Sequence, residues 1–269
     1  MSDPLSPRQP VSPAHNPVEQ ALNAASGIRP RSEYLRLTKT LTYSYIFVLP
    51  LLVIYEVGIW LINKGEVNQI RIGADLLLKT ILGYAGIHGT IWVSVVIAAI
   101  GAVIMWYERR LRLPFRPGFF GLMFLESALY GVVIGLMVAS VVTQLFSGMW
   151  LPMLQVAGQL GTTHELILSL GAGVYEELLF RLILVSTLVW ILKFMISRPR
   201  TRYIIAAVIG ALIFSAVHYI GALGDQFTLQ SFTFRFLMGL ALNAIYLWRG
   251  FGIAAMTHAL FDVFVTLAR

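Results

Sequence analysis

The sequence contains no cysteine, which excludes disulfides, thiolate nucleophiles and cysteine-ligated metal sites. Charged residues are scarce as well: they make up 12% of the chain, whereas soluble domains have about 25%. Hydrophobic residues reach 58%, and the mean hydropathy is +0.77. A soluble core could not bury this many apolar side chains. The composition therefore predicts a membrane protein, and its long continuous apolar runs favour α-helices over the alternating segments of a β-barrel.

The charge balance is basic, with 20 Lys and Arg against 13 Asp and Glu and a formal net charge of +7. A basic chain can indicate a nucleic-acid partner. Here the basic residues cluster between apolar runs, as membrane topology requires. We therefore expect no nucleic acid among the partners of this protein.

The N-terminal region differs from the rest of the chain. Residues 1–33 hold six of the eleven prolines and lack a bulky apolar run. They also lack a short apolar stretch followed by a small-residue cleavage site, so no signal peptide is expected. We predict a disordered cytoplasmic tail over residues 1–40 and an integral membrane domain over residues 41–269.

The remainder contains long apolar runs, and a membrane span needs about 20 residues. The runs cover residues 43–62, 88–107, 118–146, 161–196, 202–222, 229–248 and 252–268. The run 161–196 is too long for one crossing, and Gly171 and Gly173 predict a break or a re-entrant entry in it. The amphipathic segment 70–87 predicts an interfacial helix or an extra short membrane helix. The expected fold is an all-α, polytopic transmembrane helical bundle of about seven or eight spans.

The distribution of basic residues predicts the orientation. Basic residues lie at 29–39, 108–116, 193–202 and Arg249. With seven spans these groups all fall on one side, which should be the cytoplasm. We expect a multi-pass protein of the cell membrane with a cytoplasmic N-terminus. An additional span in the segment 63–87 would place the N-terminus on the other side.

Ten polar or charged side chains in the apolar runs are candidates for function, because a membrane tolerates such groups only when they have a partner or a functional role. They are Glu56, Glu126, Glu176, Glu177, Arg181, His218, Arg235, Asn243, His258 and Asp262. Four of them, Glu56, Glu126, Arg235 and Asn243, are expected to make interhelical bonds or to reach the interface. The sequence GVVIG at 131–135 predicts close packing of two helices within the chain.

Two adjacent carboxylates in the fourth run differ in their expected surroundings. Glu177 and Arg181 are four residues apart with the acid first, which predicts a neutralising ion pair. Glu176 points roughly 100° away from Glu177 around a helix. It has no cation four residues later. A carboxylate without such a partner is suited to act as a general base or acid.

Two histidines lie in other runs. His218 is near the end of the fifth run, where a lone histidine is more often a packing residue than a catalyst. His258 and Asp262 are four apart and face the same way, either as a local hydrogen bond or as two groups of one site. If the three runs meet at one polar cavity, Glu176 could take a proton from water while the imidazoles position that water or stabilise an oxyanion.

These residues also form three motifs in order. EELLFR at 176–181 fits Glu-Glu-x-x-x-Arg, FSAVH at 214–218 fits Phe-x-x-x-His, and HALFD at 258–262 fits His-x-x-x-Asn/Asp. The order resembles the type II CAAX-prenyl endopeptidase and bacteriocin-processing family, the CPBP or Abi intramembrane proteases. The motifs span residues 171–265, about a third of the chain.

The resemblance implies a glutamate-dependent endopeptidase that cleaves membrane-associated, prenylated or leader-peptide substrates. It implies that Glu176 activates water, that His218 shares this water, and that His258 and Asp262 line the oxyanion side. The expected partners are membrane lipid and a peptide or protein substrate. The oligomeric state and the identity of the substrate are left open by the sequence.

The remaining motif positions are interpreted as support. Glu177 and Arg181 would hold the helix in place. Many members of the family carry Asn where this chain has Asp262, and an ionised carboxylate cannot donate to an oxyanion. Asp262 must therefore be protonated, orient His258 or ligate a metal. The family has been described both as metal-dependent and as metal-independent, and no obligatory cofactor is expected. If Zn²⁺ is present, its ligands would be Glu176, His218 and His258.

Two other function classes remain as alternatives. The first is a non-catalytic immunity or scaffold protein of the same fold. The second is a proton-coupled transporter, in which Glu and His relays are typical. Many transporters show inverted repeats, whereas the ionisable groups here lie almost wholly after residue 170.

Overall fold

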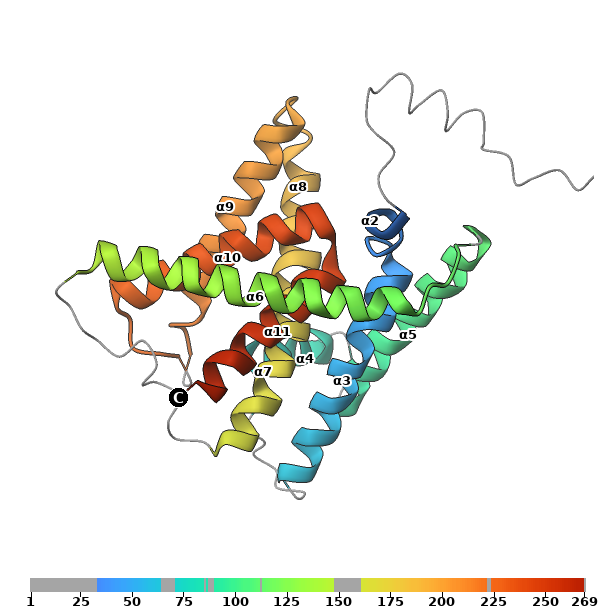
Figure 1. Cartoon of the computed structure of the whole chain (residues 1–269), viewed down its shortest axis with the longest axis horizontal. Coiled ribbons are helices and arrows are strands. Elements are labelled where there is room, and N and C mark those ends of the chain that lie inside the picture. Colours follow the sequence, from blue (N-terminus) through green and yellow to red (C-terminus); the bar gives the residue numbers. More distant parts are fainter. Residues whose placement is uncertain are drawn as a thin grey trace, which may run out of the picture. The chain divides into compact units, whose positions relative to one another are not determined.

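The computed structural model describes the chain in seven segments, which are residues 33–63, 71–84, 86, 90–111, 113–147, 161–221 and 224–268. All regular elements in these segments are helices, which confirms the all-α prediction (Figure 1). The chain divides into two units, Met1–Arg36 and Leu37–Arg269. Most of the predicted disordered tail, residues 1–32, lies outside the described residues. Near the end of that predicted tail, Glu33–Leu37 form the short helix α2.

Within the described residues, each of the predicted apolar runs is mostly helical. The elements are α3 (Leu41–Asn63), α5 (Thr90–Glu108), α6 (Gly118–Leu145), α7 (Thr162–Glu176), η2 (Glu177–Val185), α8 (Ser186–Leu192), α9 (Pro199–Val217), α10 (Leu229–Arg249) and α11 (Phe251–Leu267), with α4 (Gly73–Tyr84) in the amphipathic segment and the short η1 (Arg109–Leu111) after α5. Among the described residues, α3, α6 and α9 are long and apolar enough to cross a membrane, and α5 and α11 contain shorter apolar helices. These helices support a membrane protein, and the total of seven or eight spans stays a prediction.

The longest run is helical without interruption from Thr162 to Leu192, so the predicted break at Gly171 and Gly173 was wrong, whereas the alternative of a re-entrant entry stays a prediction. The chain passes from α7 through the π-helix η2 into α8 without a loop. The glycines permit close packing instead. A Cβ atom on Gly173 would lie 2.5 Å from the carbonyl oxygen of Ala255 in α11, and one on Gly171 would lie 2.4 Å from the ring of Tyr55 in α3. The glycines therefore let α7 approach both neighbours closely.

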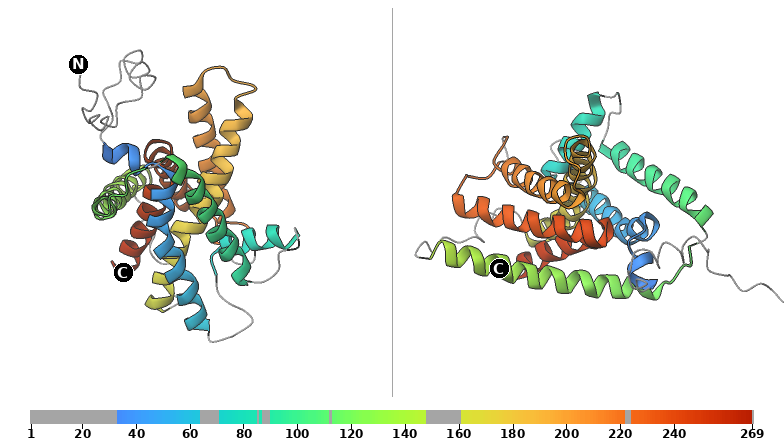
Figure 2. Two further views of the ribbon diagram at one scale, coloured as in Figure 1. Left: turned by 90° about the vertical axis from the view of Figure 1, so that its right-hand side faces the viewer. Right: turned by 90° about the horizontal axis from the view of Figure 1, so that it is seen from above.

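Helix α11 forms the centre of the second unit, where it packs against α7, α6, α3 and α10 (Figure 1). Its first part, from Gly252 to Leu260, is buried throughout. Helix α6 runs across one side of α11 and beside α10 (Figure 2). A Cβ atom on Gly135 of α6 would lie 2.7 Å from the ring of Phe261 in α11. The predicted role of GVVIG in packing two helices of this chain is therefore confirmed.

Buried polar side chains join the helices as the sequence indicated. Asn243 of α10 donates to the carbonyl oxygen of Ala207 in α9 at 2.7 Å. Glu126 of α6 pairs with Arg249 at the end of α10, with 2.6 Å between Oε1 and Nε. Arg249 also donates to Thr38 at 3.0 Å. The predicted interhelical bonds of Asn243 and Glu126 are thus confirmed, and they fix α10 to its neighbours on both sides.

Candidate active site

The site begins where α7 changes into a π-helix. Glu176 is the last residue of α7 and Glu177 the first of η2. A π-helix takes more residues per turn than an α-helix, and such segments are frequent at functional sites. Arg181 Nη1 lies 3.0 Å from Glu177 Oε1, and both side chains are 0% exposed. The ion pair predicted from the spacing is confirmed, and it is wholly enclosed by protein.

Three helices bring three ionisable side chains to one point. Glu176 at the end of α7 places Oε2 3.9 Å from Nε2 of His218, which follows α9, and 3.9 Å from Nε2 of His258 in α11. These separations are too long for direct hydrogen bonds and suit a bridging water. The Glu176 side chain is 13% exposed and that of His218 is 23% exposed. The predicted convergence of the three runs is confirmed, whereas the catalytic roles stay predictions.

The imidazole of His218 is oriented by its own helix. Its Nδ1 lies 2.7 Å from the carbonyl oxygen of Phe214, one turn earlier in α9. A carbonyl oxygen can only accept, so Nδ1 must donate. In the neutral ring, Nε2 is then an acceptor that faces Glu176. His218 can therefore accept a proton, or a hydrogen bond, from a molecule placed between the two side chains.

The imidazole of His258 is held by two carboxylates. Its Nδ1 lies 2.7 Å from Glu177 Oε1, and its Nε2 lies 3.5 Å from Asp262 Oδ2. Glu177 therefore both pairs with Arg181 and accepts a hydrogen bond from His258. No pattern in the sequence indicates this second contact, because it joins residues 81 positions apart. Of the three roles considered for Asp262, orienting His258 is the one that this contact favours.

Phe214 contacts both the guanidinium of Arg181 and the two imidazoles. The guanidinium of Arg181 lies over its ring at 4.3 Å from the centroid, a favourable cation–π geometry. The ring also makes edge contacts with His218 and His258, at centroid distances of 4.8 and 6.2 Å. Sequence reasoning counted Phe214 only as a motif position and assigned it no role. Its place one turn before His218 was the available signal.

A second polar cluster anchors the end of α7 to α3, α4 and α5. The hydroxyl of Tyr175 donates to Glu56 of α3 at 2.7 Å, and Ser94 of α5 donates to the same carboxylate at 2.6 Å. Arg71 pairs with Glu56 at 3.2 Å and with the fully buried Asp75 of α4 at 2.9 Å. The predicted interhelical role of Glu56 is confirmed. This cluster fixes the residue that precedes Glu176.

The zinc shell considered from the sequence, Glu176, His218 and His258, stays a prediction. Within the described segments, no group of three or more His, Cys, Asp or Glu residues is arranged to hold a metal ion. Nδ1 of His258 is bound to Glu177 and Nδ1 of His218 to the carbonyl oxygen of Phe214, so the two Nε2 atoms are the ring nitrogens that lie near Glu176.

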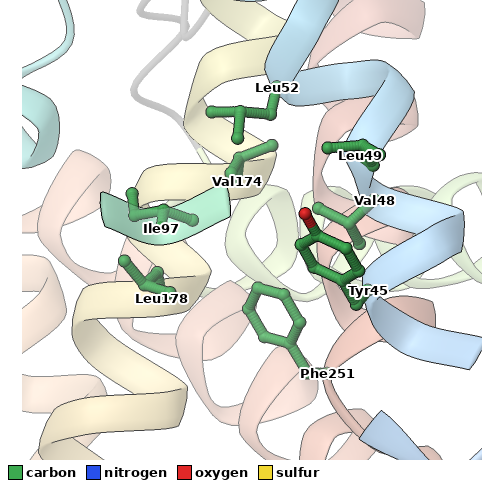
Figure 3. Close-up of a pocket in the computed structure, with 8 residues that line it drawn as sticks. All are labelled: Tyr45, Val48, Leu49, Leu52, Ile97, Val174, Leu178 and Phe251. Carbon is green, nitrogen blue, oxygen red and sulfur yellow. The ribbon is translucent and has the colours of Figure 1, made fainter. Parts of the chain in front are cut away.

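An apolar cavity lies between α3, α5, the α7–η2 junction and the start of α11 (Figure 3). Its lining includes Val174 and Leu178, each two residues from Glu176 and therefore on the other side of the helix. Tyr45 also lines it, and its hydroxyl donates to the carbonyl oxygen of Ala98 in α5 at 3.0 Å. The imidazoles are absent from this lining. The cavity therefore lies on the side of the helix that faces away from Glu176.

Comparison with known families adds to this geometry. Residues 160–264 match the family model described as Type II CAAX prenyl endopeptidase Rce1-like. These residues are Rce1-like. The matched segment runs from α7 into α11, contains all three motifs and confirms the resemblance found from them. None of the curated proteins and none of the solved structures matches the chain significantly. The Rce1-like match supports a membrane endopeptidase at the level of the family.

Proposed function

We propose that this protein is an intramembrane endopeptidase that hydrolyses peptide bonds with a water activated by Glu176 and His218. The observation that carries the proposal is the single Glu176 oxygen 3.9 Å from Nε2 of both His218 and His258. The Rce1-like match over the same helices supports a peptide as the substrate. A water between these groups can donate one hydrogen to Glu176 and one to His218, which leaves an oxygen lone pair for attack.

The proposed reaction has two steps. In the first, the water oxygen bonds to the peptide carbonyl carbon while its proton passes to Glu176, and the carbonyl oxygen becomes an oxyanion. His258 carries both ring protons: Nδ1–H donates to Glu177, and Nε2–H stabilises the oxyanion. In the second step the C–N bond breaks and Glu176 returns the proton to the leaving amine. The products are a new C-terminal carboxyl group and an amine, and Glu176 is regenerated.

We further propose that the preferred substrates are peptides with a prenylated cysteine near the C-terminus, as the name of the matched family suggests. The test uses purified protein in liposomes and one fluorogenic peptide with and without the prenyl group, beside a leader-type peptide. We expect kcat/KM to be at least about tenfold higher for the prenylated form, because the lipid holds it at the membrane. Equal cleavage of both forms contradicts this preference. If none of the peptides is cleaved, the proposed endopeptidase activity is contradicted.

We propose that hydrolysis needs no metal, because Glu176 and His218 are placed to activate water directly. Cleavage after treatment with 1,10-phenanthroline or EDTA should stay within about twofold of the untreated rate, since chelators inactivate only proteins that depend on a bound metal. The rates are compared in the same liposomes. A loss of activity that Zn²⁺ restores would show that a metal takes part.

We propose a location in the cell membrane with the N-terminus in the cytoplasm, supported by the basic residues between the apolar runs. Because the chain has no cysteine, a Glu33→Cys variant carries a single thiol. An impermeant maleimide added to intact cells should leave this thiol unlabelled and should label it after lysis. Labelling in intact cells contradicts the orientation.

A further inference from the structure

A polar cluster lies directly beyond His218, and Arg235 of α10 is its centre. Nη1 of Arg235 donates to the hydroxyl of Tyr219 at 2.8 Å and to Ser231 at 2.7 Å, and Nη2 pairs with Asp225. A guanidinium presents its donors in a rigid planar fork, so one side chain holds all three partners in fixed positions. The sequence predicted only an interhelical bond or an interfacial position for Arg235.

The cluster is connected to the backbone of His218. Helix α9 ends at Val217, so the backbone after it depends on other contacts. The backbone N–H of Asp225 donates to the carbonyl oxygen of His218 at 2.9 Å. Tyr219, which Arg235 holds through its hydroxyl, is the next residue in the chain. Arg235 thus reaches His218 from two directions, through Asp225 and through Tyr219.

We propose that Arg235 is a positioning residue, which holds the backbone around His218 so that Nε2 stays directed at Glu176. This inference rests on the proposed function, because it assigns a purpose to the orientation of His218. The side chains of Arg235 and Asp225 are 23% and 27% exposed. Breaking a partly exposed ion pair costs less stability than breaking a fully enclosed one. Loss of the pair should therefore affect the reaction rate more than the resistance to unfolding.

The variants Arg235→Gln and Asp225→Asn each remove one charge of the pair. We expect each to lower kcat about tenfold, because small displacements of a catalytic group are costly, and to leave KM within about twofold. The double variant should cost no more than either single variant, because both act through one ion pair. Arg235→Lys, which keeps the charge, should retain more of the rate than Arg235→Gln. The control Arg200→Gln removes an exposed charge near the other end of α9 and should leave kcat unchanged.

Three kinetic results would overturn the proposal. The first is an unchanged kcat in the single variants. The second is a double variant whose loss is the product of the two single losses. The third is a raised KM with kcat intact, which would indicate that Arg235 contacts the substrate.

Hydrogen exchange measured by mass spectrometry gives a readout that needs no activity. In Arg235→Gln and Asp225→Asn, the backbone N–H of residue 225 should exchange faster than in the wild type and in Arg200→Gln. The thermal midpoint should stay close to that of the wild type. Unchanged exchange overturns the proposal. If the wild type cleaves no peptide, the proposed function fails, and the exchange data still show whether Arg235 holds this segment. If the wild type is active and the variants behave like it, only the role of Arg235 fails.

Discussion

A Glu176→Gln variant is expected to cleave peptides about a thousandfold more slowly than the wild type, because an amide cannot take the proton of the attacking water. The substitution keeps the size of the side chain. The contacts that fix the end of α7, including the bond from Tyr175 to Glu56, do not involve Glu176. The helices should therefore pack as before. The measurement is kcat in liposomes, with circular dichroism and detergent unfolding as checks of the fold.

Glu165→Gln is the matched control, since it makes the same exchange on α7, about three turns before Glu176. It should keep the activity of the wild type. Cleavage by Glu176→Gln at the wild-type rate contradicts the mechanism. The two alternative functions, a scaffold or immunity protein and a proton-coupled transporter, predict instead that the wild type itself cleaves no peptide.

The largest expected loss of stability follows from removing the cation of the buried ion pair. Arg181 and Glu177 are both 0% exposed, so Arg181→Met removes the guanidinium from an enclosed carboxylate, which keeps only its bond to His258. We expect the free energy of unfolding to fall by about 3–5 kcal/mol. The fluorescence of the six tryptophans can follow unfolding by SDS. Arg200→Met, which removes an exposed arginine, should change the free energy of unfolding by less than about 0.5 kcal/mol.

The double variant Glu177→Leu/Arg181→Met separates stability from catalysis. Replacement of a whole buried pair by apolar side chains is often neutral, so most of the stability lost in Arg181→Met should return. Activity should stay low by about 10- to 100-fold, because Nδ1 of His258 loses its acceptor and the ring its orientation. A double variant less stable than Arg181→Met contradicts the assignment of the ion pair. A fully active double variant contradicts the role of Glu177 in orienting His258.

Local spacing made several features of the site predictable. The pair Glu177 and Arg181 and the pair His258 and Asp262 follow from the four-residue period of a helix. The apolar runs predicted the helices themselves, because a run of about 20 apolar residues has few alternatives in a membrane. The meeting of Glu176 with both histidines was inferred from the scarcity of other ionisable groups in the later runs, and the distances agree with it.

Features that depend on packing between distant segments could not be predicted. The bond from His258 to Glu177 and the stacking of Arg181 on Phe214 depend on how η2, α9 and α11 cross. The glycines of α7 illustrate the same limit. Gly171 and Gly173 were interpreted as a break or a re-entrant entry because the run is too long for one crossing, yet Gly173 serves the close approach of α11 at Ala255. The sequence contains the glycine but not the neighbour that requires it.

The central claim is that Glu176, His218 and His258 act on one water at one peptide carbonyl. A structure of the protein in lipid with a phosphinic peptide analogue, in which a tetrahedral phosphinate replaces the scissile amide, tests it most directly. We predict that one phosphinate oxygen lies beside the Glu176 carboxyl group and His218, and the other beside Nε2 of His258. A phosphinate bound elsewhere, or a site in which the two imidazoles point away from Glu176, would contradict the account.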